Sequence, residues 1–177
     1  MASTIRAVTV IEVTRTYVQL QHPEDLRPAD RADPTVRVER ADPCPAGLYR
    51  FLYGEVGVRY HWVDRRDWTD TQIDDHLGQS GISIWVLRVE EAIAGFFELS
   101  RHPDGSTEIV YFGLLHAYLG RGLGRHMLTV AVQRAWETGA NRVWLHTCTL
   151  DHPSALPNYL ARGFTKFKSE TYTVERG

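Results

Sequence analysis

The stretch Leu119-Gly120-Arg121-Gly122-Leu123-Gly124-Arg125 decides the fold, because it separates two segments of different periodicity. Before it, residues 107–115 (TEIVYFGLL) form an apolar run typical of a β-strand. After it, apolar residues recur every fourth position from Leu123 to Ala135, which predicts an amphipathic helix ended by Gly139. The three alternate glycines therefore predict a tight strand-to-helix turn at which a ligand can approach the backbone closely.

This turn has the properties of an anion site. The first amides of a helix lack intrahelical partners and suit a phosphate. Residues 114–136 contain no Asp or Glu, although the chain holds 22 in 177 residues, and Arg121 and Arg125 add positive charge. An ordinary glycine-rich turn is the alternative, and we favour phosphate binding. The P-loop pattern is absent, and a GxGxxG fingerprint fails because Arg125 occupies its last position.

On the N-terminal side of the turn, three β-rich runs follow one another. Residues 82–89 and 92–100 are separated by Glu90-Glu91, and HPDGS separates the second run from residues 107–115. This pattern predicts an antiparallel meander. After the long helix, we expect a strand at 142–150, a short helix over residues 151–163 and a closing strand at 165–175.

The first third of the chain is more heterogeneous. We expect a strand within residues 8–18, a proline-rich surface connector over residues 23–45 that includes a short strand at 35–40, and a helix over 47–56. A second helix should begin after Asp67, where Thr69 is a candidate cap. The whole reads as an α+β fold with a mixed, mostly antiparallel sheet flanked by helices. A strand at 8–20 would have to pair with a sheet edge, within the chain or in a homodimer.

Composition narrows the possible functions. Length 177 and 43% hydrophobic residues indicate an ordinary globular protein, and a net charge of −2 gives no general attraction to nucleic acid or to a membrane surface. Two cysteines cannot form a disulfide scaffold, and the start of the chain lacks a leader-like apolar segment, so we expect a cytoplasmic protein. Eight histidines show no HxH, HxxxH or HExxH spacing, which argues against a metal site.

Two motifs resemble the GNAT superfamily of acetyl-CoA-dependent N-acetyltransferases. The signature [Q/R]xxGx[G/A] is similar to residues 119–124, LGRGLG, although Leu119 departs from the usual Gln or Arg. The later element AxxxYxxxGF is similar to the run from Ala155 through Tyr159 to Gly163-Phe164. The resemblance covers about residues 36 to 177. It divides the chain into an N-terminal extension, residues 1–34, and a GNAT domain, residues 35–177.

The resemblance implies acetyl-CoA as co-substrate, no metal, and an amine acceptor. The pantetheine arm would lie along the strand that precedes the glycine turn, where its partners are Phe112, Gly113 and Leu114. The backbone of the turn would receive the pyrophosphate, at Gly120, Arg121, Gly122, Leu123, Gly124 and Arg125. His152 occupies the place where relatives often carry an Asn that touches the pantetheine arm.

The same resemblance assigns catalytic roles. Tyr159 matches the tyrosine that protonates the leaving thiolate, and its alternative is a packing tyrosine in the core. Glu108 has the spacing of a general base that deprotonates the acceptor, and its alternative is a solvated carboxylate at a strand end. His146 and His152 could also assist proton transfer. We interpret Cys148 as a small core residue, not as a nucleophile.

The acceptor is expected to meet the loop of residues 59–68, RYHWVDRRDW. This loop is either core packing around two tryptophans or an aromatic wall for an apolar or cationic acceptor. The sequence thus predicts transfer of an acetyl group to a primary amine of a small molecule or peptide. A catalytically silent acyl-CoA-binding sensor module, or a nucleotide-binding interaction module, are the alternatives.

Overall fold

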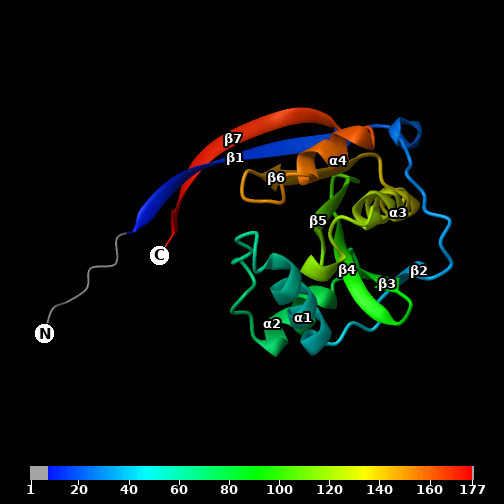
Figure 1. The fold of residues 1–177 in the computed structure, drawn as a ribbon, viewed down its shortest axis with the longest axis horizontal. Coiled ribbons are helices and arrows are strands. Elements are labelled where there is room, and N and C mark those ends of the chain that lie inside the picture. The colour runs from blue at the N-terminus through cyan, green and yellow to red at the C-terminus, as the bar shows by residue number, and fades with distance from the viewer. Residues whose placement is uncertain (1–7, 177) are drawn as a thin grey trace, which may run out of the picture.

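A computed structural model of the protein describes residues 8–176, in which a seven-stranded sheet has the strand order β2-β3-β4-β5-β6-β1-β7 (Figure 1). All pairings are antiparallel except that of β5 with β6, which confirms the predicted α+β class with a mixed sheet. Residue 177 and residues 1–7, where the predicted extension begins, lie outside the described residues. The strands are β1 Thr9–Leu20, β2 Val36–Arg40, β3 Ile82–Val89, β4 Ala92–Arg101, β5 Thr107–Leu114, β6 Val143–Cys148 and β7 Thr165–Arg176, and the helices are α1 Ala46–Gly57, α2 Asp70–Leu77, α3 Leu123–Glu137 and α4 Ala155–Ala161.

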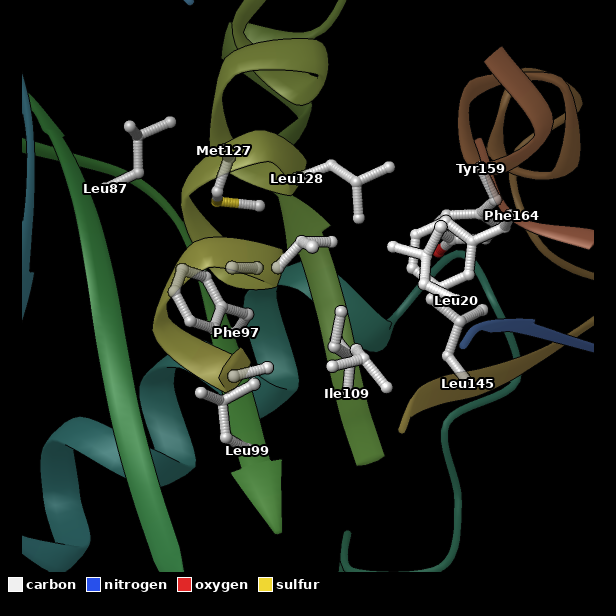
Figure 2. Close-up of a cluster of buried hydrophobic side chains, with 14 of the residues drawn as sticks. Leu20, Leu87, Phe97, Leu99, Ile109, Met127, Leu128, Leu145, Tyr159 and Phe164 are labelled. Atoms are coloured by element: carbon white, nitrogen blue, oxygen red, sulfur yellow. The ribbon is translucent and has the colours of Figure 1, made fainter. Parts of the chain in front are cut away.

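The predicted meander is confirmed as β3, β4 and β5, and it buries side chains on both faces of the sheet. Phe97 packs with Leu99 and Met127 between the sheet and α3 (Figure 2). Its neighbour Phe96 points to the other face, where it packs with Leu52 of α1. Both phenylalanines are fully buried, since successive residues of a strand point to opposite faces. The near-continuous apolar pattern of these strands follows from this two-sided burial.

The parallel pair β5 and β6 is short and then opens. Only Thr107 pairs with Val143 and Glu108 with Trp144, and no further pairs link the two strands as far as Leu114. The facing edges of β5 and β6 beyond Glu108 therefore lack the hydrogen bonds of a sheet ladder. Backbone groups left in this way need another partner, such as a ligand.

The N-terminal strand lies inside the sheet. We expected it to pair with a sheet edge, within the chain or in a homodimer, and it pairs within the chain, antiparallel to β6 on one side and to β7 on the other. Val13, Val18 and Leu20 are buried there. A strand inserted between two others satisfies its own backbone groups on both sides and those of both neighbours. The pairing forms within one chain, and the proposed domain boundary at residue 34 stays a prediction.

The connector between β1 and β2 lies across α3 and α4. The backbone N–H of Ala29 donates to Thr129 Oγ1 at 2.9 Å, and that of Arg31 to His126 Nδ1 at 3.2 Å. Farther back, Arg27 N–H donates to the carbonyl of Arg162 at 2.9 Å. The predicted surface connector is thus confirmed as largely exposed, and these bonds hold it beside the start of α3.

Candidate functional site

A cavity of about 460 Å³ opens where β5 and β6 separate. On the side of α3 and α4 it is lined by Phe112, Leu114 and Tyr159, which belong to the core on that face. On the side of α1 and α2 it is lined by Trp62 and Tyr111, which belong to the opposite core. The cavity therefore connects the two faces of the sheet, so two molecules that enter from opposite faces can meet in it.

The glycine turn, residues 119–125, borders the cavity on the side of α3 and α4. Gly120 and Gly122 have φ of 74° and 76°, the left-handed region that favours glycine, and Gly122 is the residue that precedes α3. No side chain caps the helix, so its first amides stay free. Of the six residues predicted to receive the pyrophosphate, 120–125, Gly124 lines the cavity. The side chain of Leu123 is buried in the core, which leaves its backbone as the part that faces a ligand.

A third arginine joins the turn from far away in the sequence. Arg31 Nη1 donates to the carbonyl oxygen of Arg121 at 2.6 Å, and its Nε pairs with Asp33 at 3.2 Å. The contact of Arg31 with the turn was not predicted from the sequence, because Arg31 lies in the proline-rich connector, 90 residues before Arg121. No local pattern places that connector against α3. The connector therefore adds a guanidinium beside the turn, together with its ion-pair partner Asp33.

The groove beside β5 suits an extended polar chain. Phe112, Gly113 and Leu114 all line it, as the resemblance implied. A Cβ on Gly113 would lie 2.4 Å from Val56 Cγ1, so only glycine permits the packing of α1 here. Asn158, which the sequence analysis missed, also lines the cavity, and its Oδ1 is buried without a hydrogen-bond partner. A buried acceptor of this kind needs an N–H donor, which an amide-bearing ligand such as pantetheine would supply.

Tyr159 lies at the junction of the core and the cavity. Tyr159 is 6% exposed and packs beside Phe164 (Figure 2). The ring centroids of Phe112 and Phe164 each lie 6.1 Å from that of Tyr159. Burial, with the charge of Asp151 adding to it, raises the pKa of Tyr159 well above its usual value. The phenol therefore keeps its proton near neutral pH and can act as a donor. Both the packing role and the acid role fit this position.

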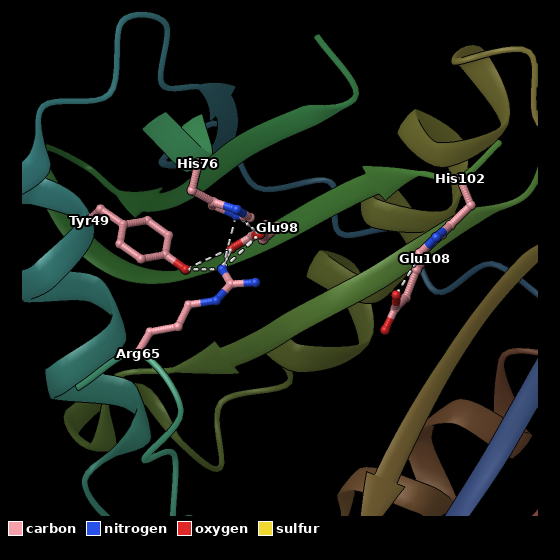
Figure 3. Close-up of polar contacts among 6 residues, drawn as sticks. All are labelled: Tyr49, Arg65, His76, Glu98, His102 and Glu108. Carbon is pink, nitrogen blue, oxygen red and sulfur yellow. Dashed lines mark hydrogen bonds and ion pairs between the residues drawn. The ribbon is translucent and has the colours of Figure 1, made fainter. Parts of the chain in front are cut away.

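Glu108 is the last residue of β5 that pairs with β6, and it is buried. Its Oε2 is 2.8 Å from His102 Nε2 (Figure 3). Its Oε1 is 3.9 Å from His146 Nε2. His146 lines the cavity, whereas the carboxylate of Glu108 lies behind it and is not part of the lining. Burial, with the charge of Arg15 adding to it, lowers the pKa of His146, which favours the neutral imidazole. His146 is thus the group of this pair that can reach a ligand.

His152 also lines the cavity, but its hydrogen bonds favour a different role. Its Nδ1 accepts from the backbone N–H of Ser154 at 3.1 Å. An Nδ1 that accepts carries no proton, so in the neutral ring Nε2 carries it. The neutral side chain is thus a donor toward its surroundings and not a base, which agrees with the expected contact to a cofactor.

The loop of residues 59–68 both packs on the core and lines the cavity, and its contact with an acceptor stays a prediction. Trp62 packs on Tyr111 with ring centroids 4.7 Å apart, and both tryptophans of the loop line the cavity. Arg65 anchors the loop, because its guanidinium contacts the fully buried Glu98 at 2.7 Å (Figure 3). Tyr49 OH and His76 Nε2 complete this cluster, at 2.8 and 2.7 Å from the Glu98 carboxylate. The wall of the cavity is thus also core packing.

Cys148 differs from the expectation of a core residue. It is half-buried and lines the cavity, because it lies near the end of β6 where the sheet has opened. Burial, with the charge of Asp151 adding to it, raises the pKa of its thiol. The thiolate is therefore disfavoured, and the expectation that this cysteine is not a nucleophile stands as a prediction.

Residues 8–176 contain neither a cluster of metal ligands nor a helix that could span a membrane. Among residues 8–176, no group of three or more His, Cys, Asp or Glu side chains gathers to hold a metal ion. None of the helices in the part of the chain that the structure describes is long and apolar enough to span a membrane.

Comparison with known families assigns this architecture. Residues 48–164 match the acetyltransferase (GNAT) family. A mycothiol acetyltransferase of Corynebacterium efficiens is 35% identical over 113 residues, which cover 60% of this chain and 37% of the relative. A second mycothiol acetyltransferase, from Corynebacterium aurimucosum, is 37% identical over 76 residues, which cover 41% of this chain and 25% of that relative. The chain therefore spans well under half of the curated relatives it matches.

Solved structures share the fold at low sequence identity. A GCN5-related N-acetyltransferase from Kribbella flavida superposes with a TM-score of 0.66 at 18% identity, over 95% of this chain and 59% of that one. Another from Sphaerobacter thermophilus gives 0.67 at 15% identity, over 93% and 51%. An aminoglycoside acetyltransferase from a soil metagenome gives 0.61 at 17% identity, over 75% and 90%. The expected GNAT-type fold is thereby confirmed.

Proposed function

Since the chain belongs to the acetyltransferase (GNAT) family, we propose that it transfers an acetyl group from acetyl-CoA to a primary amine of a small molecule or peptide. The observation that carries the proposal is the cavity that connects both faces of the sheet, with Tyr159 and His146 in its lining. Two mycothiol acetyltransferases are among the similar proteins, which supports the transfer of an acetyl group.

The chain offers a complete set of contacts for acetyl-CoA. The free amides after Gly122, with Arg121, Arg125 and Arg31 beside them, suit the pyrophosphate. The unpaired edge of β5 near Gly113 suits the amides of the pantetheine arm. Asn158 Oδ1 and the Nε2 of His152 add one acceptor and one donor. The acyl thioester that binds there supplies the activated carbonyl.

Direct attack on a thioester needs a base and an acid. His146, held neutral by its lowered pKa and backed by Glu108, accepts the proton that the amine loses as its nitrogen bonds to the carbonyl carbon. Tyr159 donates its proton to the sulfur as the carbon–sulfur bond breaks, and it recovers a proton from solvent. The thiol that forms has a pKa of about 8.5, below that of the phenol, so this proton transfer is uphill by itself and is driven by formation of the amide.

A silent acyl-CoA sensor is the second candidate function. The presence of both an acid and a base in one cavity favours the enzyme, since a sensor needs neither. Calorimetry with acetyl-CoA, NAD and ATP side by side tests the ligand, and a panel of primary amines tested for CoA release tests the reaction. We expect acetyl-CoA to bind and at least one amine to release CoA. Binding of acetyl-CoA with no turnover on any amine would favour the sensor, and binding of NAD or ATP alone would contradict both.

A further inference from the structure

Arg15 is a cation of the cavity lining that takes no part in the proposed proton transfers. It projects from β1, where it pairs with Cys148 of β6 and with Glu170 of β7. It lines the cavity together with Cys148 and Tyr172, and its guanidinium lies 5.0 Å from the centroid of the Tyr172 ring. β1 lies outside the part of the chain that matches the family model, residues 48–164.

We propose that the acceptor amine of this protein carries a carboxylate, and that Arg15 binds this carboxylate. The inference rests on the proposed function, and it narrows the acceptor to amino acids and other amines with an acidic group. Arginine is well suited to this task, because its planar fork of N–H donors matches the two oxygens of a carboxylate.

Glu170, opposite Arg15 in the ladder, and Asp151, in the cavity lining, are engaged elsewhere, whereas Asp64, the third acid around the cavity, is exposed on the loop of residues 59–68. Within residues 8–176, Arg15 forms no ion pair, although Glu170 lies directly opposite it in the ladder. Glu170 instead accepts from Lys168 Nζ at 2.7 Å and from Tyr17 OH at 3.0 Å. Asp151, which also lines the cavity, accepts from Thr147 Oγ1 at 2.6 Å and from the backbone N–H of Cys148 at 3.0 Å. Neither Glu170 nor Asp151 is free to neutralise Arg15.

The guanidinium of Arg15 also has a donor without a partner. Its Nε is buried and makes no hydrogen bond with any described residue. A buried donor of this kind is costly, and the cost is larger on a charged group. The second arginine in the cavity shows the contrast, since Arg65 is paired with the buried Glu98. Of these two cavity arginines, Arg15 is therefore the one that can pair with an anion from outside.

The position of Arg15 relative to the proposed base sets the size of the acceptor. His146 lies two residues before Cys148 on β6, on the same face of the sheet as Arg15, because Tyr17 and Arg15 are opposite His146 and Cys148. Diagonal neighbours on adjacent strands are about 7–8 Å apart at the backbone. An amine at His146 and a carboxylate at Arg15 can thus belong to one small molecule in which a few bonds separate them.

The test compares acceptors that differ only in the carboxylate. Glycine, β-alanine, 4-aminobutyrate and glycylglycine are each paired with the corresponding amide. Their binding to the protein in complex with CoA is measured by calorimetry, which needs no turnover. We expect at least one carboxylate to bind about tenfold or more tightly than its amide, and Arg15→Met to remove this preference. Arg15→Lys should keep part of it, because the charge remains and the fork is lost.

Arg40→Met is the control, since Arg40 of β2 is exposed, lies outside the cavity lining and the loop of residues 59–68, and loses the same charge. It should keep the preference for carboxylates. Thermal unfolding confirms that each variant is folded. If every acid binds no better than its amide, or if Arg15→Met keeps the preference, the inference is wrong, whatever the turnover. CoA release from the same acceptors then tests the proposed function separately, because it depends on the chemical step and not on the carboxylate.

Discussion

The imidazole of His146 lies 3.9 Å from the carboxylate of Glu108, at the point where β5 and β6 stop pairing. This distance is longer than a hydrogen bond, and it leaves the two groups within reach of each other through small movements or a bridging water. The imidazole of His146 lines the cavity, whereas the carboxylate of Glu108 is not part of the lining. We therefore regard Glu108 as a group that acts through His146.

This relationship predicts the pH dependence of turnover. The pKa of His146 is lowered from 6.5 by burial and by Arg15, so the neutral base is present at pH 7 and is lost as the pH falls through that lowered value. Glu108→Gln removes the charge that raises the pKa of His146, so the acidic limb of kcat/KM should move to lower pH while turnover falls. Relative to the wild type, the defect should therefore be smallest at low pH, where the variant keeps more of the neutral imidazole. His146→Asn should remove the limb, and an unchanged profile in both variants would exclude this pair.

The acid role of Tyr159 predicts a separation of turnover from binding. Tyr159→Phe keeps the ring that packs on Phe112 and Phe164 and removes only the hydroxyl group. Turnover should fall on the order of 10²-fold, while the affinity for acetyl-CoA changes little. Steady-state kinetics with calorimetry measure both. Full turnover in this variant would leave solvent or His152 as the proton donor.

Gly124 provides a test of close approach between the helix start and acetyl-CoA. A Cβ at Gly124 would have its nearest neighbours at 3.8 and 3.9 Å, so the protein itself accommodates alanine. Gly124→Ala should fold with unchanged or higher stability yet bind acetyl-CoA more weakly, and Gly124→Glu should abolish binding by adding a negative charge at the phosphate site. Gly54→Ala in α1, where nothing lies within 4 Å, is the control that should leave affinity unchanged. Equal affinity in all three variants would place the phosphates elsewhere.

The cluster around Glu98 predicts a loss of stability on acidification. Burial disfavours the Glu98 carboxylate, but the hydrogen bond from His76 and the charge of Arg65 outweigh it and lower its pKa. Its contribution to stability is therefore complete above the unfolded value, about 4.3, and is lost as the pH falls through the folded value. Glu98→Gln should destabilise the protein by about 3 kcal/mol or more at pH 7, because Arg65 is left without its counter-ion.

Tyr49→Phe is the matched variant within the same cluster, because it removes one hydrogen bond to Glu98 and no charge. It should cost about 1 kcal/mol. Denaturant unfolding between pH 3 and pH 7 gives both values. A Glu98→Gln variant as stable as the wild type at pH 7 would show that the cluster does not hold the loop of residues 59–68.

The interior position of β1 predicts that this strand is essential to the fold. Deletion of residues 1–20 should abolish cooperative thermal unfolding, because β6 and β7 would each lose a neighbour. Val18→Ala, at a fully buried site, should cost about 2 kcal/mol, whereas Val10→Ala, at a site that is 60% exposed, should change stability by less than about 0.5 kcal/mol. Light scattering on the full chain tests the homodimer that we proposed from this strand. A stable truncated protein would support an independent domain after residue 34.

Local patterns in the sequence were sufficient for much of the fold. β-rich apolar runs and the turn residues between them predicted the meander. Apolar residues at every fourth position predicted α3, and the glycines predicted the turn before it. Capping chemistry predicted the start of α2, where Thr69 Oγ1 accepts from the backbone N–H of Gln72 at 3.2 Å. Each of these features depends on residues within a few positions of one another, so the sequence contains the whole signal.

The tertiary structure decided everything that depends on distant segments. The insertion of β1 between β6 and β7 brings Arg15 beside Cys148, although 133 positions separate them in the numbering. The connector brings Arg31 to the glycine turn, and the opening of β5 from β6 lets His146 stand between Glu108 and the cavity. Periodicity and spacing describe the face that a residue presents but not the partner that covers it. The glycine turn could therefore be predicted from the sequence, whereas the side of the cavity that Arg15 lines could not, because a sheet joins residues by backbone pairing across any length of chain.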